Sequence, residues 1–372
     1  MISGPVKTSL ASSLALIMCL NAHSASIGSS NSSMVSITAI DNKEHHNASM
    51  ATSEVISDHR QLCGLGGLSH DRELYAIASN HAKYINHLQE KINVSNIDTH
   101  YQAELKGYED FTGYRNPYFT GFDFTQRVIG ARYQNAIYGG SENIMQEEIT
   151  SKDGLVPSTI SVAKDFAHGL LAAPYHMQSL MEPSRDLIGT SFNTYTPVKI
   201  DDGLKKGYSL VSAVSSTKAG SKKSVDGLFT YPCEGVSGTF TALYNESPSP
   251  VAGTGRNLRI DPIGQPIYIN IPSAKEIKLS NVRMQDIMRN KFVPTEILDY
   301  RNDPHKGTEY SLLKSKAFIL PITDNIKSCK AGKYTNCGLN SNTEYQVSFD
   351  VLIDNKRLIK HSFKFKTGNL NR

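Results

Sequence analysis

The sequence predicts an α+β chain in which helices and a small sheet come first and an all-β region follows. Apolar residues recur with helical spacing over residues 68–92 and 158–170. Two strand-like runs come next, at 186–193 and 207–214, and a polar turn separates them. Beyond about residue 238, short alternating strands divided by turn residues predict an antiparallel β-sandwich.

Each predicted helix is indicated by apolar residues along one face or by the residues that begin and end it. In the first helix, that face consists of Leu74, Ile77, Ala78, Ala82, Ile85 and Leu88. Ser158 is a good N-cap for the second helix, and Pro174 ends it. The second helix should therefore deliver His176 just beyond its end.

The later strands are short and evenly divided. They are expected at residues 238–244, 266–271, 316–320, 345–351 and 361–367. A Ser-, Lys- and Gly-rich stretch and a proline-stiffened segment precede most of them, so residues 217–250 are predicted to be a linker and 251–372 the second domain.

The N-terminus has the features of a secretory signal. Lys7 precedes an apolar run over residues 10–20, and small residues follow near position 25, so residues 1–25 read as a signal peptide. A lipid anchor on Cys19 ranks second, because bulky Met18 stands where such signals carry a small residue. A secreted or periplasmic protein without a transmembrane segment is expected.

Residues 26–59 are rich in Ser, Asn and Thr and show little apolar periodicity. This composition predicts a flexible leader outside any core. The first domain is then expected over residues 60–216.

Four cysteines remain after the signal peptide, and an oxidising compartment favours disulfides. Cys329 and Cys337 enclose a short loop that would close with little strain, so their pairing is favoured. Cys63 with Cys233 would then clasp the two ends of the first domain, provided that their Cα atoms come within bonding range. Zinc is the alternative for these thiols, but the sequence has no Cys-x-x-Cys spacing.

Charge argues against one class of partner. The chain carries 39 Lys and Arg against 35 Asp and Glu, a net charge of only +4, and no segment concentrates basic residues with interleaved aromatics. Nucleic acid is therefore not expected as a partner.

Three short segments deliver two imidazoles and a carboxylate in order. They are Asp98-Thr99-His100-Tyr101, Ser141-Glu142-Asn143-Ile144 and Ala173-Pro174-Tyr175-His176, and Arg127 lies between the first two. This order with these separations resembles the bacterial branch of the CAP superfamily (cysteine-rich secretory proteins, antigen 5, pathogenesis-related proteins). The resemblance implies a secreted α-β-α sandwich, and residues 339–345 with 363–367 resemble the last strands of bacterial immunoglobulin-like modules.

The resemblance also implies a cleft. His100 and His176 match the two histidines of the family, and Glu142 matches the glutamate of its Gly-Glu-Asn-Ile motif. In the family the imidazoles can hold a divalent cation such as zinc, so His100 and His176 are candidate metal ligands. The carboxylate could polarise a bound water or fix an imidazole tautomer.

Several positions depart from the family pattern. Ser141, Leu170 and Met177 replace its usual glycine, tryptophan and arginine, whereas Gly189 matches the glycine at the start of a strand. The second glutamate of the tetrad has no match, because Ala163 and Lys164 stand there. The candidates to replace it are Asp165, Glu147 and Glu148.

The leading functional hypothesis is a non-enzymatic binding protein whose His/Glu cleft holds a divalent cation or a small ligand. Its partner could be a small ligand, a peptide or a cell-surface component. The first alternative is a metal-assisted hydrolase with Glu142 as general base on a water held by His100 and His176. The second is a purely structural or interaction protein. Arg127 is expected to anchor a short helix by ion pairing, without a catalytic role.

Overall fold

The computed structural model describes residues 43–92, 98–151, 156–198, 204–222, 226–323 and 338–369. The expected signal peptide and the favoured Cys329–Cys337 pair lie outside these ranges. Residues 40–372 belong to one compact unit. Within the described ranges, no helix combines the length and the apolar character that a membrane crossing requires.

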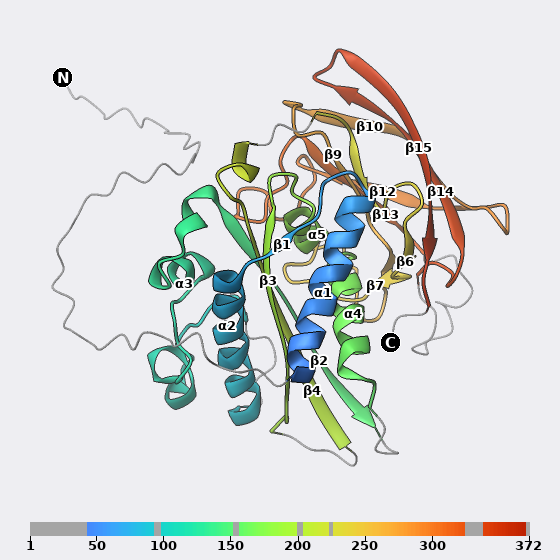
Figure 1. Ribbon diagram of the computed structural model, residues 1–372. Helices are drawn as coiled ribbons and strands as arrows, with labels where there is room; N and C mark the ends of the chain where they lie inside the picture. Colours follow the sequence, from blue (N-terminus) through green and yellow to red (C-terminus); the bar gives the residue numbers. More distant parts are fainter. Residues whose placement is uncertain are drawn as a thin grey trace, which may run out of the picture. The chain divides into compact units, whose positions relative to one another are not determined.

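The first part of the chain, residues 43–222, is built around a four-stranded sheet of order β1-β3-β4-β2 (Figure 1). β1 (Ser69–His70) runs parallel to β3 (Leu187–Tyr195). β4 (Leu204–Ser215) pairs antiparallel with β3 and with β2 (Gly140–Ser151). β3 and β4 are the two strands that the sequence predicts, whereas the long β2 was not predicted and carries Glu142.

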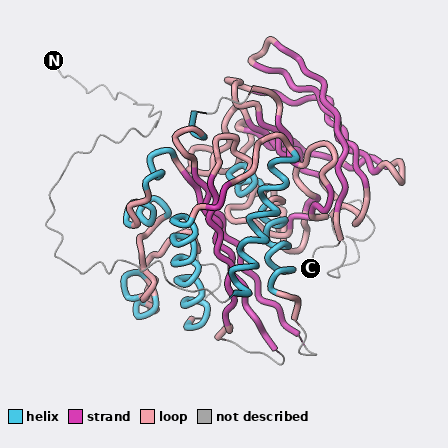
Figure 2. The backbone as a smooth tube through the Cα atoms, in the orientation of Figure 1, coloured by secondary structure: helices cyan, strands magenta, loops and turns pink. Residues whose placement is uncertain are grey.

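Helices cover both faces of this sheet (Figure 2). α2 (Arg72–Lys91) packs on one face, and its apolar side chains cluster with Val211. α1 (Lys43–Leu62) and α4 (Thr159–Leu170) pack on the other face, where Leu210 joins their core. Because neighbouring strand residues point to opposite faces, β4 is buried on both sides. The first part is therefore a helix–sheet–helix sandwich.

Capping residues set the helix starts where the sequence predicts them. Asp71 accepts a backbone N–H of α2, and Ser158 accepts one of α4 at 3.2 Å. Pro174 does more than end α4, because it opens a further helix, α5 (Pro174–Leu180). His176 therefore lies in the first turn of α5.

Helix α1 corrects the expectation of a flexible leader over residues 26–59 for its part from Lys43 on, whereas residues 26–42 lie outside the described ranges. Its buried face consists mainly of small residues such as Ala48, Ser49 and Thr52, with Ile56 as the large apolar member. The Thr52 hydroxyl donates to the Ala163 carbonyl of α4. A face of Ala, Ser and Thr lets two helices approach closely, but it has no strong apolar period and therefore looks like a polar tail in the sequence.

The C-terminal end of α1 is anchored by a buried arginine. The Arg60 guanidinium donates to the carbonyls of Leu180, Glu182 and Arg185 at 2.5, 3.0 and 2.8 Å. Burial is the main cause that lowers its pKa, to about 10, so it stays charged at neutral pH. Arg60 thus ties α1 to the segment that follows α5.

Short helices fill the remaining connections of the first part. They are η1 (Glu109–Phe111), η2 (Gly113–Arg115), α3 (Phe124–Gly130), η3 (Gln134–Tyr138) and η4 (Gly220–Lys222). α3 begins at the cap residue Asp123 and carries Arg127 on its buried side. It precedes β2 and so brings Arg127 toward Glu142.

The second part, residues 226–369, contains two larger sheets of order β11-β10-β14-β15-β6 and β12-β13-β9-β5, and a separate β7-β8 pair. Their bounds are β5 Phe229–Tyr231, β6 Ser237–Thr239, β7 Ala242–Leu243, β8 Ile263–Gly264, β9 Ile267–Asn270, β10 Ile277–Asp286, β11 Lys291–Val293, β12 Thr295–Asp299, β13 Lys316–Pro321, β14 Glu344–Ile353 and β15 Arg357–Thr367. Apolar residues of both sheets share one core, among them Val347 and Phe318. With helices in the first part and these sheets in the second, the chain is of mixed α and β class.

The predicted linker over residues 217–250 is corrected as well. It contains β5, which pairs with β9, and β6, which pairs with β15, so it belongs to the sheets of the second part. A disulfide joins Cys63 to Cys233 with a Cα–Cα distance of 5.6 Å. This confirms the predicted pairing, and it ties the residue that follows α1 to the segment between β5 and β6.

Candidate functional site

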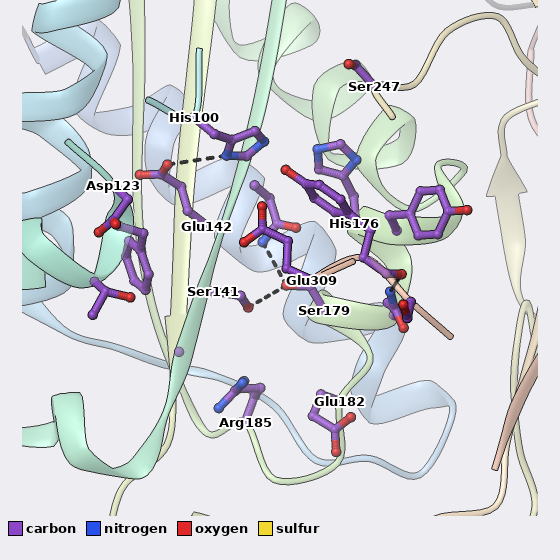
Figure 3. A pocket seen from close by; sticks show the side chains of 18 of the residues that line it. His100, Asp123, Ser141, Glu142, His176, Ser179, Glu182, Arg185, Ser247 and Glu309 are labelled. Atoms are coloured by element: carbon purple, nitrogen blue, oxygen red, sulfur yellow. Dashed lines mark hydrogen bonds and ion pairs between the residues drawn. The ribbon is translucent and has the colours of Figure 1, made fainter. Parts of the chain in front are cut away.

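A pocket of about 540 Å³ is lined by both parts of the chain (Figure 3). The first part supplies His100, Glu142 and His176. The second part supplies Ser247, Glu309, Tyr310, Ser311, Leu313 and Lys316. The structure thus brings the three residues singled out in the sequence to one place. Its remaining lining residues are Tyr101, Asp123, Phe124, Thr125, Gly140, Ser141, Asn143, Tyr175, Gln178, Ser179, Glu182 and Arg185.

The two histidines lie opposite each other across this pocket. Their ring centroids are 6.2 Å apart and the rings are tilted by 32°. The side chains of His100 and His176 are 23% and 13% exposed, so both are reachable from the pocket without being solvated freely. Figure 3 shows Glu142 beyond His100, on the side away from His176.

Glu142 is held in a buried ion pair. Arg127 Nη2 donates to its Oε1 at 2.6 Å, and the two side chains are 0% and 2% exposed. Burial alone would raise the pKa of Glu142, but the attraction of His81 and Arg127 outweighs it and lowers the pKa to about 2. Arg127 also donates to the His100 carbonyl at 3.3 Å. It therefore pairs as expected and also positions the His100 segment.

Because Glu142 is paired and ionised, it is a poor general base. Its Oε1 atom already accepts from Arg127 and lies 3.5 Å from His100 Nδ1. A carboxylate with a pKa of about 2 takes up little proton at neutral pH. This geometry removes the main support for Glu142 as the base of a hydrolase.

His81 is a site residue that the sequence reasoning missed. It projects from α2, is fully buried, and its Nε2 lies 3.6 Å from Glu142 Oε1. Nε2 donates to the Thr99 carbonyl and Nδ1 accepts from Gln102, both at 2.8 Å. Burial lowers its pKa to about 4, which leaves the ring neutral at neutral pH. The sequence signal that could have pointed to His81 was its position within the apolar face of the predicted helix.

Glu246 was also missed, and it is the carboxylate that contacts the second histidine. Its Oε1 accepts from His176 Nδ1 at 3.1 Å and from the backbone N–H groups of Tyr175 and His176 at 2.7 and 3.2 Å. Burial raises its pKa. No local signal pointed to it, because the surrounding Asn-Glu-Ser-Pro-Ser-Pro sequence reads as an extended connection.

The carboxylates proposed to complete the site do not line the pocket. Asp165, Glu147 and Glu148 are absent from its wall, and Glu148 instead pairs with Lys205 at 2.6 Å. The carboxylate that lies beside His176 is instead that of Glu246, which comes from the second part of the chain.

Both imidazoles are held in the same tautomer. A carboxylate only accepts, so the Nδ1 atoms that face Glu142 and Glu246 carry the proton. In a neutral ring the Nε2 atom is then a lone-pair acceptor. Among the described residues, neither Nε2 has a hydrogen-bond partner. With both rings neutral, the pocket thus offers two acceptor nitrogens to a ligand.

The donor set for a metal ion is small. Over the ranges that the structure describes, no three His, Cys, Asp or Glu side chains are grouped so that they could hold a metal ion. Two imidazoles would have to be supplemented by water or by a ligand. Zinc or another divalent cation would therefore bind weakly here, with His100 and His176 as its protein ligands.

The rest of the wall is polar and internally bonded. The hydroxyls of Ser141 and Ser179 lie 2.6 Å apart. Lys316 pairs with Glu182 at 2.9 Å, and Tyr101 donates to Glu309 at 2.8 Å. Each of these last two contacts joins the first part to the second, so the pocket wall depends on both.

Comparison with known proteins does not assign the chain to a family. The sequence matches no protein-family model and no curated protein.

Proposed function

We propose that the chain is a secreted or periplasmic binding protein in which a CAP-like domain is followed by an immunoglobulin-like module. Its pocket holds a small ligand or a divalent cation. The observation that carries this proposal is the pair His100 and His176, whose Nδ1 atoms lie 3.5 and 3.1 Å from a carboxylate and whose rings line one pocket.

Two features of the fold support the proposed class. A sheet covered by helices on both faces is the architecture that the resemblance implies, and two sheets with a common core follow it. The Cys63–Cys233 disulfide is compatible with an oxidising compartment.

A hydrolase is the second candidate, and one contact favours it. The His176–Glu246 pair resembles the carboxylate–imidazole arrangement that orients a general base. In this version His176 rather than Glu142 would accept the proton of an attacking water.

Zinc titration by calorimetry on the oxidised full chain tests the binding proposal. We expect weak one-to-one binding that the double substitution His100→Gln, His176→Gln abolishes. The matched control is His46→Gln, His70→Gln, which changes two exposed histidines outside the pocket. Equal binding by both double variants would refute a cation site at the pocket. The N-terminal helix must be kept, because α1 is part of the core.

A further inference from the structure

The pocket has a chemical preference that follows from its two acceptors. When both rings are neutral and carry their proton at Nδ1, the two Nε2 atoms are acceptors, so a ligand group between them must donate hydrogen bonds. A carboxylate or phosphate placed there would face two lone pairs. An ammonium, hydroxyl or amide group meets the requirement.

The separation of the rings suits a shared hydrogen-bond donor. Two imidazoles that accept from one tetrahedral nitrogen at about 2.9 Å have ring centroids roughly 6.6 Å apart. Two that share one tetrahedral zinc at about 2.1 Å have centroids roughly 5.2 Å apart. The observed separation of His100 and His176 is 6.2 Å, nearer to the first arrangement.

The charge of the wall favours a cation. Four carboxylates line the pocket, and only two cations do. Glu142 is neutralised by Arg127, and Glu182 by Lys316. Asp123 and Glu309 are in no salt bridge with the described residues, and one lining cation, Arg185, opposes them. Figure 3 places Arg185 on the far side of Ser141 from the two histidines.

We propose that the pocket binds its ligand through a primary ammonium group that donates to the Nε2 atoms of His100 and His176. The carbon skeleton of this amine lies against the wall contributed by the second part, where Tyr310 and Leu313 line the pocket. This inference rests on the proposed binding function and names the class of ligand.

The test compares three probes with four carbons each: n-butylamine, n-butanol and n-butyrate, titrated into the oxidised full chain by calorimetry at low ionic strength. We expect saturable binding of the amine with a dissociation constant of about 1 mM, which is about 0.8 kcal/mol per non-hydrogen atom and well within the ceiling for small ligands. Butanol and butyrate should bind at least tenfold more weakly. Equal or tighter binding of either would overturn the inference.

Two sets of variants locate the binding. His100→Leu, His176→Leu should weaken amine binding at least tenfold, and the exposed control His70→Leu should leave it unchanged. If the first variant does not fold, Asp123→Asn, Glu309→Gln provides a test that spares the imidazoles, and about a threefold weakening is expected. Unchanged amine binding in both folded variants would place the site elsewhere and refute the inference.

The same samples separate the two proposals. If zinc, butanol or butyrate binds at the pocket and the amine does not, the ammonium inference fails and the binding function stands. If neither zinc nor any of the three probes binds the wild-type chain, both fail.

Discussion

Glu246 accepts a hydrogen bond from His176 at 3.1 Å although the residues are 70 positions apart. The carboxylate comes from the second part of the chain and closes the N-terminus of α5 in the first. Nearby, the buried Tyr175 hydroxyl donates to Asp303 at 2.9 Å. These contacts make the second part a structural component of the pocket rather than a separate spacer.

Replacement of Glu246 should therefore destabilise the whole chain. Glu246→Ala removes the acceptor of three hydrogen bonds and should lower the free energy of unfolding by about 2 to 4 kcal/mol. Glu246→Gln keeps an acceptor oxygen and should cost clearly less. Urea unfolding followed by circular dichroism measures both variants, and equal losses would show that the acceptor atom does not matter.

The Arg127–Glu142 pair should behave as one unit. Glu142→Gln leaves the Arg127 charge buried without its partner, which should cost about 3 to 5 kcal/mol of unfolding free energy. The double variant Arg127→Met, Glu142→Gln removes both charges and should regain part of that loss. Urea unfolding of Glu142→Gln, of Arg127→Met and of the double variant gives the coupling energy of the pair. Strictly additive losses of unfolding free energy would contradict the buried pair.

Periodicity predicted those elements whose burial follows a large apolar face. α2 and α4 lie where the apolar spacing places them, and β3 and β4 match the two strand-like runs. α1 was missed because its contact face is made of Ala, Ser and Thr. β10 was overlooked, because the alternation that starts with buried Ile277 and Leu279 is broken by a register shift between Ser280 and Arg283, which puts buried Met284 out of phase.

For the site, motif order was enough to bring His100, Glu142 and His176 to one pocket. The residues that contact these three side chains differ in how far the sequence could have predicted them. His81 could have been found, because a histidine inside an apolar helical face must be bonded. Glu246 could not, since its burial depends on how the second part folds back on α5.

Gly189 should tolerate no side chain. A Cβ there would lie 2.1 Å from the Tyr75 backbone nitrogen of α2, where neither backbone can yield cheaply. Gly189→Ala should therefore lower the unfolding free energy by about 3 kcal/mol or more. The control is Gly130→Ala, whose Cβ would find its nearest neighbour at 3.5 Å. Thermal unfolding compares the two, and a similar melting temperature for both would contradict the close contact of α2 with β3.

The Cys63–Cys233 disulfide should contribute strongly to stability, because its ends are 170 positions apart. Closing so long a loop in the unfolded chain corresponds to about 5 kcal/mol in the chain-entropy model. Cys63→Ser, Cys233→Ser should therefore lower the urea midpoint under non-reducing conditions. The same variant should lose most of the sensitivity to dithiothreitol that the wild type shows. A wild type that is insensitive to complete reduction of this bond would refute the expected contribution.

Two histidines at the contact of α1 and α4 favour the neutral form. The rings of His59 and His168 meet edge to face with centroids 5.2 Å apart. Tyr231 OH lies 3.0 Å from His59 Nδ1, and Lys164 is the cation that acts on His168. Burial lowers the pKa of each histidine from 6.5 to about 4. A proton on either ring would be poorly solvated and would repel a proton on the other.

Stability should therefore fall in acid before most carboxylates titrate. Below pH 6.5 the unfolded chain binds protons at His59 and His168 that the folded chain refuses until about pH 4, so unfolding becomes easier across that window and is unaffected above it. Each ring should cost about 1 to 3 kcal/mol at the acid end. His81 adds in the same direction and is unchanged in the comparison.

The variant His59→Gln, His168→Phe keeps a hydrogen-bonding side chain beside Tyr231 and a ring beside Phe240. Its unfolding free energy, measured in urea from pH 7 to pH 5, should decline less steeply than that of the wild type. Parallel curves would show that these histidines are protonated equally in the folded and unfolded chains.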